Sequence, residues 1–300
     1  MGRLVLGLLT VALFWNVENC FDPFDNPLTA DDDFTPRGSY HWTWKKFLSK
    51  RNAIAKTLIA SSQVWGEFPL LVGLAEVENH LVLSQLVHNT ALAKCAYGII
   101  LREGPDRRGI NVALLYREEL FDVLKVRSIR VALPDSTRST RDILYVKGLE
   151  SGRDTLHVFV VHFPSKLGGA KASEPSRQAA ARTLSAVVDS LRAADARILV
   201  MGDFNDVPSS EVLREIPLAN KADSLSAQGL GTLRYRGQWE LIDHFRVSGA
   251  LDRVSQMKIF APSFLLEDDP KFPGKRPFRS KMGPRYHGGV SDHLPIMLKW

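Results

Sequence analysis

The amino-acid sequence predicts a layered α/β domain in which β-sheets stack on one another. Short apolar runs rich in β-branched residues recur along the 300 residues, and segments with helical spacing lie between some of them. Several runs are apolar on both faces, and strands of that kind must be covered on both sides. Stacked sheets meet this requirement better than a single open sheet. The length fits one large domain or two ordinary ones, and we expect a single domain spanning residues 1–300.

Eight short apolar runs predict the strands, because each is bounded by turn-forming or polar residues. In chain order they are Val11–Trp15, Leu70–Ala75, Ile110–Tyr116, Ile143–Val146, Leu156–Val161, Ile198–Met201, Leu241–Val247 and Leu294–Leu298. Two longer segments predict helices. Trp42–Ser61 carries apolar residues at helical spacing, and Glu174–Ala194 does so too in an alanine-rich composition that favours helix.

The N-terminal segment has two interpretations. Arg3 precedes an apolar run from Leu4 to Trp15, which resembles the core of a signal peptide. No small-x-small cleavage site ends the run, so a buried first strand is favoured. The run is too short to span a bilayer, and no later segment is long and apolar enough to do so. A cytoplasmic location is therefore favoured, with a periplasmic or secreted one as the alternative.

Composition narrows the function classes. Hydrophobic residues make up 45% and charged residues 24%, which is ordinary for a globular protein. The two cysteines, Cys20 and Cys95, form no CxxC pair and cannot build a zinc ribbon, so we expect buried thiols. The net charge of +6 and the pI near 9.3 favour polyanionic partners such as nucleic acid, anionic lipid or phosphorylated small molecules.

Polar residues that can bind metal or phosphate follow four of the predicted strands. Catalytic groups at strand ends on one rim of a scaffold are a common enzyme arrangement. Two further acidic residues also lie close to predicted strands, one within a strand and one just before a strand. The residues are Asn16 and Glu18, Glu76, His162, Asp203 with Asn205, and then Asp243 and Asp292.

Each motif also has a purely structural interpretation. Asp203 and Asn205, two residues apart, can act on one water or phosphate oxygen, or can form an Asx turn. In Ser291-Asp292-His293 an acid and an imidazole lie side by side, as they also would in a surface turn. Glu76 suits a hard metal ion but also a helix N-terminus, and His162 is equally compatible with a core histidine.

The order of these motifs is what decides between the interpretations. The chain resembles the endonuclease/exonuclease/phosphatase superfamily, whose members have the deoxyribonuclease I-like fold. The resemblance starts at Phe14–Asn19, passes through Glu76 and His162, and reaches Gly202–Asn205. It continues at Ile242-Asp243 and closes with Ser291–His293. The segments His162–Gly169 and Tyr235–Trp239 are similar to an uncharacterised bacterial branch of that family.

The resemblance implies a four-layered α/β sandwich, in which two mixed, mostly antiparallel sheets pack face to face between flanking helices. It also implies hydrolysis of phosphoesters with Mg²⁺ or Mn²⁺. Glu76 would be the main metal ligand, with Asn16 and Asp292 close by. Asp203 would orient or deprotonate the attacking water, and Asn205 would help to hold the phosphate.

Further roles follow from the same resemblance. His293 would contact the phosphate, Asp243 would fix its ring, and His162 would stabilise charge or assist the leaving group. Arg141 falls where many members place an arginine that binds phosphate. There are two departures. No equivalent of the tyrosine that several nucleases use is found, and Asn111 stands where an aspartate is expected.

The substrate is less well defined than the reaction. The segment Lys271–Lys281 contains no acidic residue and leads towards Asp292, so it could grip a nucleic-acid backbone or dock anionic lipid. A nucleic acid or another phosphodiester is the expected partner, and we expect a monomer. A phosphatase or phospholipase-type esterase is the alternative. A non-catalytic binding module is disfavoured, because it would be expected to have lost some of these residues.

Overall fold

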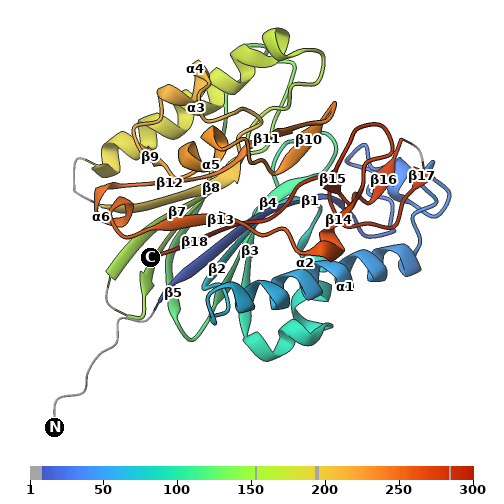
Figure 1. The fold of residues 1–300 in the computed structure, drawn as a ribbon, viewed down its shortest axis with the longest axis horizontal. Helices are drawn as coiled ribbons and strands as arrows, with labels where there is room; N and C mark the ends of the chain where they lie inside the picture. Colours follow the sequence, from blue (N-terminus) through green and yellow to red (C-terminus); the bar gives the residue numbers. More distant parts are fainter. Residues whose placement is uncertain (1–8, 153, 193–195, 284) are drawn as a thin grey trace.

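Two six-stranded sheets dominate the computed structural model, which describes residues 9–152, 154–192, 196–283 and 285–300 (Figure 1). The first sheet has the order β13 (Gln256–Ile259), β18 (Ile296–Lys299), β1 (Val11–Cys20), β2 (Leu71–Val77), β4 (Asn111–Arg117) and β3 (Tyr97–Leu101). The second has the order β5 (Phe121–Ile129), β6 (Ile143–Glu150), β7 (Asp154–His162), β8 (Arg197–Asp203), β12 (Asp243–Val247) and β9 (Ala219–Asn220). Among the strands of the described residues, the pairs β1–β2 and β7–β8 are parallel and the other pairs are antiparallel.

Helices and small hairpins surround the sheets. The long helices are α1 (Trp44–Ser61), α2 (His80–His88) and α3 (Ala170–Arg192), and the short ones are α4 (Glu211–Arg214), α5 (Asp223–Ala227) and α6 (Gly249–Asp252). Single 3₁₀ turns are η1 (Asp32–Phe34), η2 (Ser62–Val64), η3 (Ala91–Cys95) and η4 (Ser263–Leu265). The hairpins pair β10 (Leu233–Tyr235) with β11 (Gln238–Glu240), β14 (Leu266–Asp268) with β15 (Lys275–Pro277), and β16 (Lys281–Met282) with β17 (Arg285–Tyr286).

Strand β1 shows why the sheets stack. Ala12 and Phe14 lie in the core between the two sheets, whereas Leu13 and Trp15 lie in a second core beneath α1 and α2. Because side chains alternate along a strand, a run that is apolar at every position buries both of its faces. Burial of a side chain such as Phe14 contributes roughly 1.5–3 kcal/mol, so this strand stabilises two layers at once.

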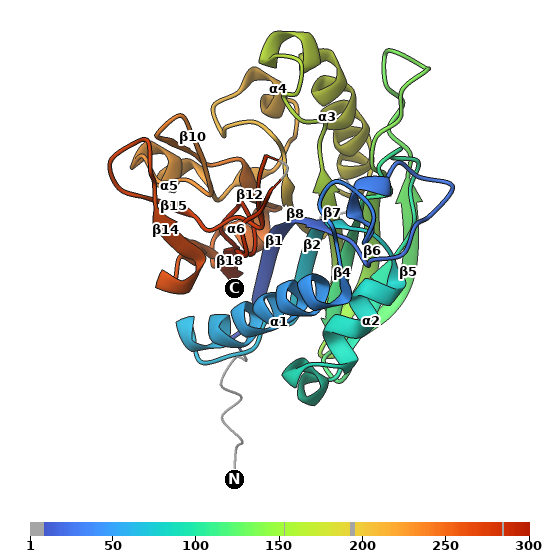
Figure 2. The same ribbon diagram turned by 90° about the vertical axis from the view of Figure 1, so that its right-hand side faces the viewer.

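Helix α3 covers the outer face of the second sheet. Ala180 and Leu184 pack there with Val161 and Val200 in a third core. Figures 1 and 2 show α3 on one side of the stacked sheets and α1 with α2 on the other. The layers therefore run helix, sheet, sheet, helix, and the four-layered sandwich is confirmed.

All eight predicted strands are present, with ends that shift by a few residues. The two predicted helices are α1 and α3, although Ala194 lies outside the described residues. Of the apolar N-terminal run, residues 4–8 also lie outside the described part, and Val11–Trp15 forms the first half of β1. Cys20 and Cys95 are free and buried, as expected. Within the described ranges, no helix has the length and apolar composition that crossing a membrane requires.

A buried ion pair ties α3 to the segment that follows β8. Arg177, 2% exposed, donates from Nε to Asp206 Oδ2 at 3.0 Å and from its other nitrogens to Ser173 Oγ and the Ala170 carbonyl. Replacing Arg177 by methionine should lower the free energy of unfolding by about 3–5 kcal/mol, because it leaves the buried Asp206 carboxylate without this partner. Urea titration followed by circular dichroism measures the change.

The matched control is Arg182→Met on the same helix, where the arginine is exposed. Its free energy of unfolding should stay within about 0.5 kcal/mol of that of the native protein. Equal effects of the two replacements would show that the Arg177–Asp206 pair does not anchor the helix.

Candidate active site

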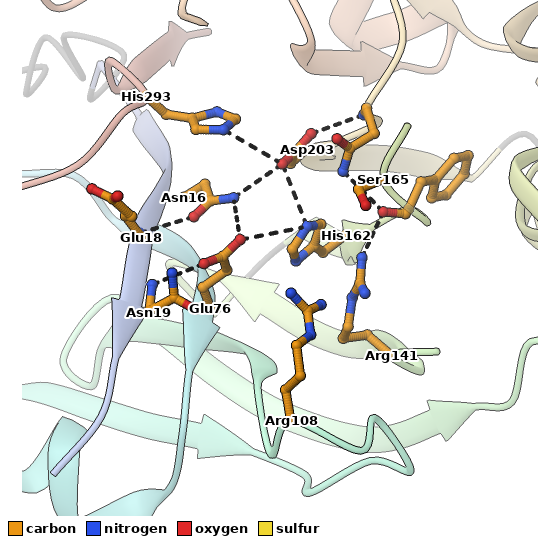
Figure 3. A network of polar contacts seen from close by, with 12 residues as sticks. Asn16, Glu18, Asn19, Glu76, Arg108, Arg141, His162, Ser165, Asp203 and His293 are labelled. Atoms are coloured by element: carbon orange, nitrogen blue, oxygen red, sulfur yellow. Dashed lines mark hydrogen bonds and ion pairs between the residues drawn. The ribbon is translucent and has the colours of Figure 1, made fainter. Parts of the chain in front are cut away.

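The polar residues at the strand ends gather at one end of the sandwich, where the two sheets face each other (Figure 3). The first sheet supplies Asn16 from β1 and Glu76 from β2, and His293 precedes β18. The second sheet supplies His162 from β7, Asp203 from β8 and Asp243 from β12.

Three of these residues are register partners in the second sheet. His162 pairs with Asp203 across the parallel β7–β8 ladder, and Asp203 pairs with Asp243 across the antiparallel β8–β12 ladder. Leu199 and Met201 lie in the core between the sheets. The same alternation directs Asp203 towards the first sheet, so the site continues the inner core at its polar end.

Glu76 reaches the site through a β-bulge. Val72 and Leu74 lie beneath the helices, and simple alternation would send Glu76 to that outer side as well. The register of β2 with β4 shifts between Ala75 and Val77, and Glu76 has a φ of 62°. A bulge of this kind re-aims one side chain, and here it turns a metal-ligand candidate into the site.

Asn16 joins the two sheets. Its Nδ2 donates to Glu76 Oε1 at 3.2 Å and to Asp203 Oδ2 at 3.0 Å. Its Oδ1 accepts the backbone N–H of Glu18 at 3.0 Å, and the second Glu76 oxygen accepts the backbone N–H of Asn19 at 2.8 Å. One amide therefore fixes the spacing between a carboxylate of each sheet.

The backbone around the site is strained. Glu18, Asn19, Glu76 and Asn205 all have φ between 50° and 62°, in the left-handed region. Each such residue costs on the order of 1–3 kcal/mol unless the surroundings hold it. Strain of this kind concentrates at functional sites, which supports a functional role for this end of the sandwich.

Three buried residues, Asp203, Asp243 and His293, contact one another where the second sheet faces the start of the last strand. His293 Nδ1 lies 2.8 Å from Asp243 Oδ2, and its Nε2 lies 3.9 Å from Asp203 Oδ2. Burial alone would lower the pKa of His293, but the carboxylates of Asp243 and Asp203 outweigh it and raise that pKa well above its usual value. His293 is therefore an oriented imidazolium.

Burial raises the pKa of Asp203 to about 7. The Asp243 carboxylate adds to this rise, and the charge on His293 opposes it. Ligand atoms of Asp203, Asp243 and His293 lie within 4.8 Å of one another, which would also suit a metal ion. A metal ion needs a neutral imidazole, however, and the two carboxylates favour the protonated one. We therefore favour an ion-paired triad here.

His162 differs from His293 in charge. Its Nε2 lies 3.5 Å from Asp203 Oδ2 and 4.0 Å from Glu76 Oε1. Burial, followed by the positive charges of Arg141 and Arg108, lowers the pKa of His162 well below its usual value. It is therefore a neutral imidazole, suited to hydrogen bonding rather than to charge neutralisation.

Asp292 lies in an acidic corner that the sequence did not predict. Its Oδ2 accepts from Arg279 Nη2 at 2.9 Å, and the same nitrogen lies 3.2 Å from Glu18 Oε1. Glu18 also accepts from the backbone and hydroxyl of Ser280. Burial and then Asp292 raise the pKa of Glu18 to about 7. The basic segment Lys271–Lys281 therefore reaches the site through Arg279, which pairs with Asp292.

Asn205 and Arg141 meet at one backbone oxygen. The carbonyl of Phe163, directly after His162, accepts from Asn205 Nδ2 at 3.0 Å and from Arg141 Nη2 at 2.6 Å. Arg141 Nη1 donates to Asp106 at 3.0 Å. Asp203 Oδ1 accepts the backbone N–H of Asn205 at 2.8 Å, so the Asx turn is also present. The structural interpretation of the Asp203–Asn205 motif therefore applies, and the catalytic one stays a prediction.

Asn111 has a role in holding the backbone. Its Nδ2 donates to the carbonyls of Glu78 and Gly109, and its Oδ1 accepts the N–H of Gly104. An aspartate could not make the two donor contacts. The departure from the expected residue therefore leaves the strand-end loops firmly held.

The fold and the gathered carboxylates, imidazoles and amides define a hydrolase of phosphoester bonds. The family model described as "Endonuclease/Exonuclease/phosphatase family" matches residues 10–300, and the chain belongs to that family. No curated protein matches the sequence.

Solved structures show the same fold at low sequence identity. Truncated Caenorhabditis elegans TDP2 is 16% identical, with a TM-score of 0.63 and coverage of 98% of each chain. The human Nocturnin catalytic domain with bound sulfate anion is 17% identical, with a TM-score of 0.59 and coverage of 97% of this chain and 93% of that one. D. rerio TDP2 complexed with single strand DNA product is 16% identical, with a TM-score of 0.57 and coverage of 97% and 98%.

Proposed function

We propose that this protein is a divalent-metal-dependent phosphodiesterase, with nucleic acid as its leading substrate class and residues 1–300 acting as one domain. The observation that carries the proposal is the amide of Asn16, which contacts Glu76 of one sheet and Asp203 of the other. Two carboxylates held at one amide, with a neutral and a charged imidazole beside them, suit attack by water on a phosphoester.

The donor set fits Mg²⁺ or Mn²⁺ at Glu76. Mg²⁺ prefers oxygen ligands and keeps several waters, so one or two carboxylates are enough. The side chain of Glu76 is 15% exposed, which leaves it open to a cation and its waters. Asn16 would hold the carboxylate in place, and Asp292 would contribute once freed from Arg279. When bound, the cation would polarise the phosphoryl oxygens and stabilise the added negative charge.

Four side chains would carry out the proton transfer and the binding of the phosphate. Asp203 takes a proton from the attacking water as the water oxygen bonds to phosphorus, while Asn205 holds the phosphate. The bond between phosphorus and the leaving oxygen breaks, and the leaving oxygen receives a proton from Asp203 or from solvent. The imidazolium of His293, oriented by Asp243, neutralises charge on a phosphoryl oxygen. His162, being neutral, donates a hydrogen bond to the phosphate or to the leaving oxygen.

Two observations support a nucleic-acid substrate. A cavity of about 120 Å³ beside the site is lined by five cations, Arg234, Arg236, Lys271, Arg276 and Arg279, and by Asp269 and Asp292. Three of the cations pair with carboxylates, and Arg236 and Lys271 add positive charge beyond those pairs. A structure of the same fold, D. rerio TDP2, holds a single strand DNA product. Lysine and arginine beside a cleavage site bind the phosphate backbone regardless of sequence.

A substrate panel with and without EDTA tests the proposal. It covers plasmid DNA, oligonucleotides, bis-nitrophenyl phosphate, inositol phosphates and phospholipids. We expect Mg²⁺-dependent cleavage of the phosphodiesters, with the nucleic acids turned over fastest. Turnover of inositol phosphates or phospholipids alone would assign the site to a phosphatase or phospholipase-type esterase.

Replacing Glu76 by glutamine should lower Mg²⁺-dependent turnover by roughly 10²-fold or more, because the loss of several kcal/mol of charge stabilisation costs a factor of ten per 1.4 kcal/mol. Calorimetric titration with Mn²⁺ should show weakened binding as well. Glu211→Gln, on the exposed surface of α4, is the matched control and should bind and turn over normally. Native Mn²⁺ affinity in Glu76→Gln would place the metal elsewhere.

A further inference from the structure

A polar cavity of about 270 Å³ opens beside Pro164 and Ser165, which follow His162 in the chain, and is not used by the proposed reaction. It lies between the loop of Arg107 and Arg108, the segment around Arg138 and Arg141, and the region from Pro164 into the start of α3. Serine and threonine hydroxyls fill most of the remaining wall. Four arginines face this space with one acid, so the cavity is strongly cationic.

The arginines are only partly neutralised. Asp106 pairs with Arg108 at 3.2 Å and with Arg141 at 3.0 Å. Arg107 and Arg138 are exposed and form no ion pair within the described ranges of the chain. Two positive charges therefore remain for a ligand that enters from solvent.

Two buried polar atoms in the wall also lack partners. Thr140 is 3% exposed and its Oγ1 has no hydrogen bond, and Arg141 is 6% exposed with an unpartnered Nε. A buried polar atom without a partner is uncommon and calls for an explanation. A guanidinium N–H is a donor only, and a hydroxyl can donate as well, so both suit an acceptor-rich anion.

The cavity adjoins the cleavage centre through the Phe163 carbonyl, which accepts from Arg141 on the cavity side and from Asn205 on the catalytic side. Figure 3 shows Arg108 and Arg141 beside His162 and Glu76. A group bound among the arginines would therefore be a near neighbour of the phosphate undergoing hydrolysis.

We propose that this cavity is a second phosphate subsite, which holds the phosphate next to the scissile one. Pockets for whole small molecules measure about 300–1,000 Å³, so a cavity of about 270 Å³ lies near the lower end of that range and has room for a phosphate group. Arginine binds phosphate in a bidentate manner, which explains the use of arginine here. The inference rests on the proposed function and sharpens it, because the preferred substrate then carries at least two successive phosphates.

Binding of thymidine phosphates tests the subsite without turnover. Calorimetry in Mg²⁺ buffer compares thymidine 3′,5′-bisphosphate with thymidine 5′-monophosphate and thymidine 3′-monophosphate. The bisphosphate should bind roughly 10- to 100-fold more tightly than either monophosphate. A hydrogen bond to a charged group contributes enough binding free energy to change the dissociation constant by about that factor. The double variant Arg107→Gln/Arg138→Gln should lose most of this advantage and keep its monophosphate affinity.

The matched control is Arg253→Gln, an exposed arginine just after α6 and away from the strand ends that form the site. It should keep the full preference for the bisphosphate. Equal affinity for bisphosphate and monophosphates in the native protein would overturn the subsite. So would a preference that survives the double variant.

Kinetics separates failure of the subsite from failure of the proposed function. Nitrophenyl thymidine 5′-phosphate is compared with the same ester carrying a 3′-phosphate, and nitrophenyl thymidine 3′-phosphate with its 5′-phosphorylated form. The second phosphate should raise kcat/KM in one of the two pairs, and the double variant should remove that gain alone. Turnover of all four esters at equal kcat/KM would support the phosphodiesterase and reject the subsite.

Discussion

Replacing Asp203 by asparagine is expected to lower kcat for phosphodiester hydrolysis by roughly 10²- to 10⁴-fold, the usual contribution of general base catalysis. Asparagine has the same shape but only one acceptor oxygen, so it can accept from Asn16 or from the backbone N–H of Asn205 and loses the other contact. It cannot take a proton from water. Steady-state hydrolysis of bis-nitrophenyl phosphate with Mg²⁺ measures the loss. Asp189→Asn, on the exposed face of α3, is the matched control.

The same replacement should flatten the dependence of stability on pH below about pH 7, which distinguishes lost chemistry from lost folding. Burial raises the pKa of Asp203 to about 7, whereas an unfolded aspartate titrates near 3.9. Between these values the folded state binds more protons than the unfolded state, so stability falls as the pH rises. The neutral Asp203→Asn variant avoids this loss. A folded variant with unchanged kcat would refute the role of Asp203 as base.

Asp243→Asn should lower kcat on the order of 10²- to 10⁴-fold, the range expected when a catalytic imidazole loses the acid that orients it. The 2.8 Å contact between Asp243 Oδ2 and His293 Nδ1 sets the ring so that Nε2 faces Asp203. An amide in place of the carboxylate disturbs both the ring position and its charge.

The pH profile shows which of these effects dominates. After burial, which lowers it, Asp243 is the largest influence on the pKa of His293 and raises it. Without this acid the pKa falls, so the imidazolium is lost at lower pH and the alkaline limb of the kcat profile should move towards acid. Asp252→Asn, just beyond the other end of β12, should leave the profile unchanged. A fall in kcat without movement of this limb would indicate a purely steric role.

The layered fold was predictable because the central strands are apolar at every position. Strand β5 was missed for the opposite reason. It lies at the edge of the second sheet, and most of its residues are only partly buried or exposed, so its sequence lacks a continuous apolar run. Helix α2, nine residues long, was missed as well, and its Asn79 cap became recognisable only from the contact of its side chain with the N–H of Val82.

The site residues were predictable as polar residues after apolar runs, but their arrangement was not. The alternation of side chains along a strand places Asp203 on the correct face of its sheet. It would place Glu76 on the wrong face, because a regular alternation does not predict the β-bulge at this position. Arg279 pairs with Asp292 and also with Glu18, which lies more than 260 residues away in the sequence. No local sequence pattern predicts a contact over that separation. The opposite charge states of His162 and His293 likewise depend on neighbours that only the fold provides.

The amide of Asn16 has a consequence for how this protein can change over time. Half of the site belongs to each sheet, and the core between the sheets sets how the halves align. At Gly73, a β-carbon would lie 2.6 Å from Met201 Sδ of the opposite sheet, so even a methyl group there would force the Met201 side chain or the sheets to shift. Since a misplacement of about 1 Å can cost roughly 10² in rate, natural selection for turnover also constrains interior residues that no substrate touches.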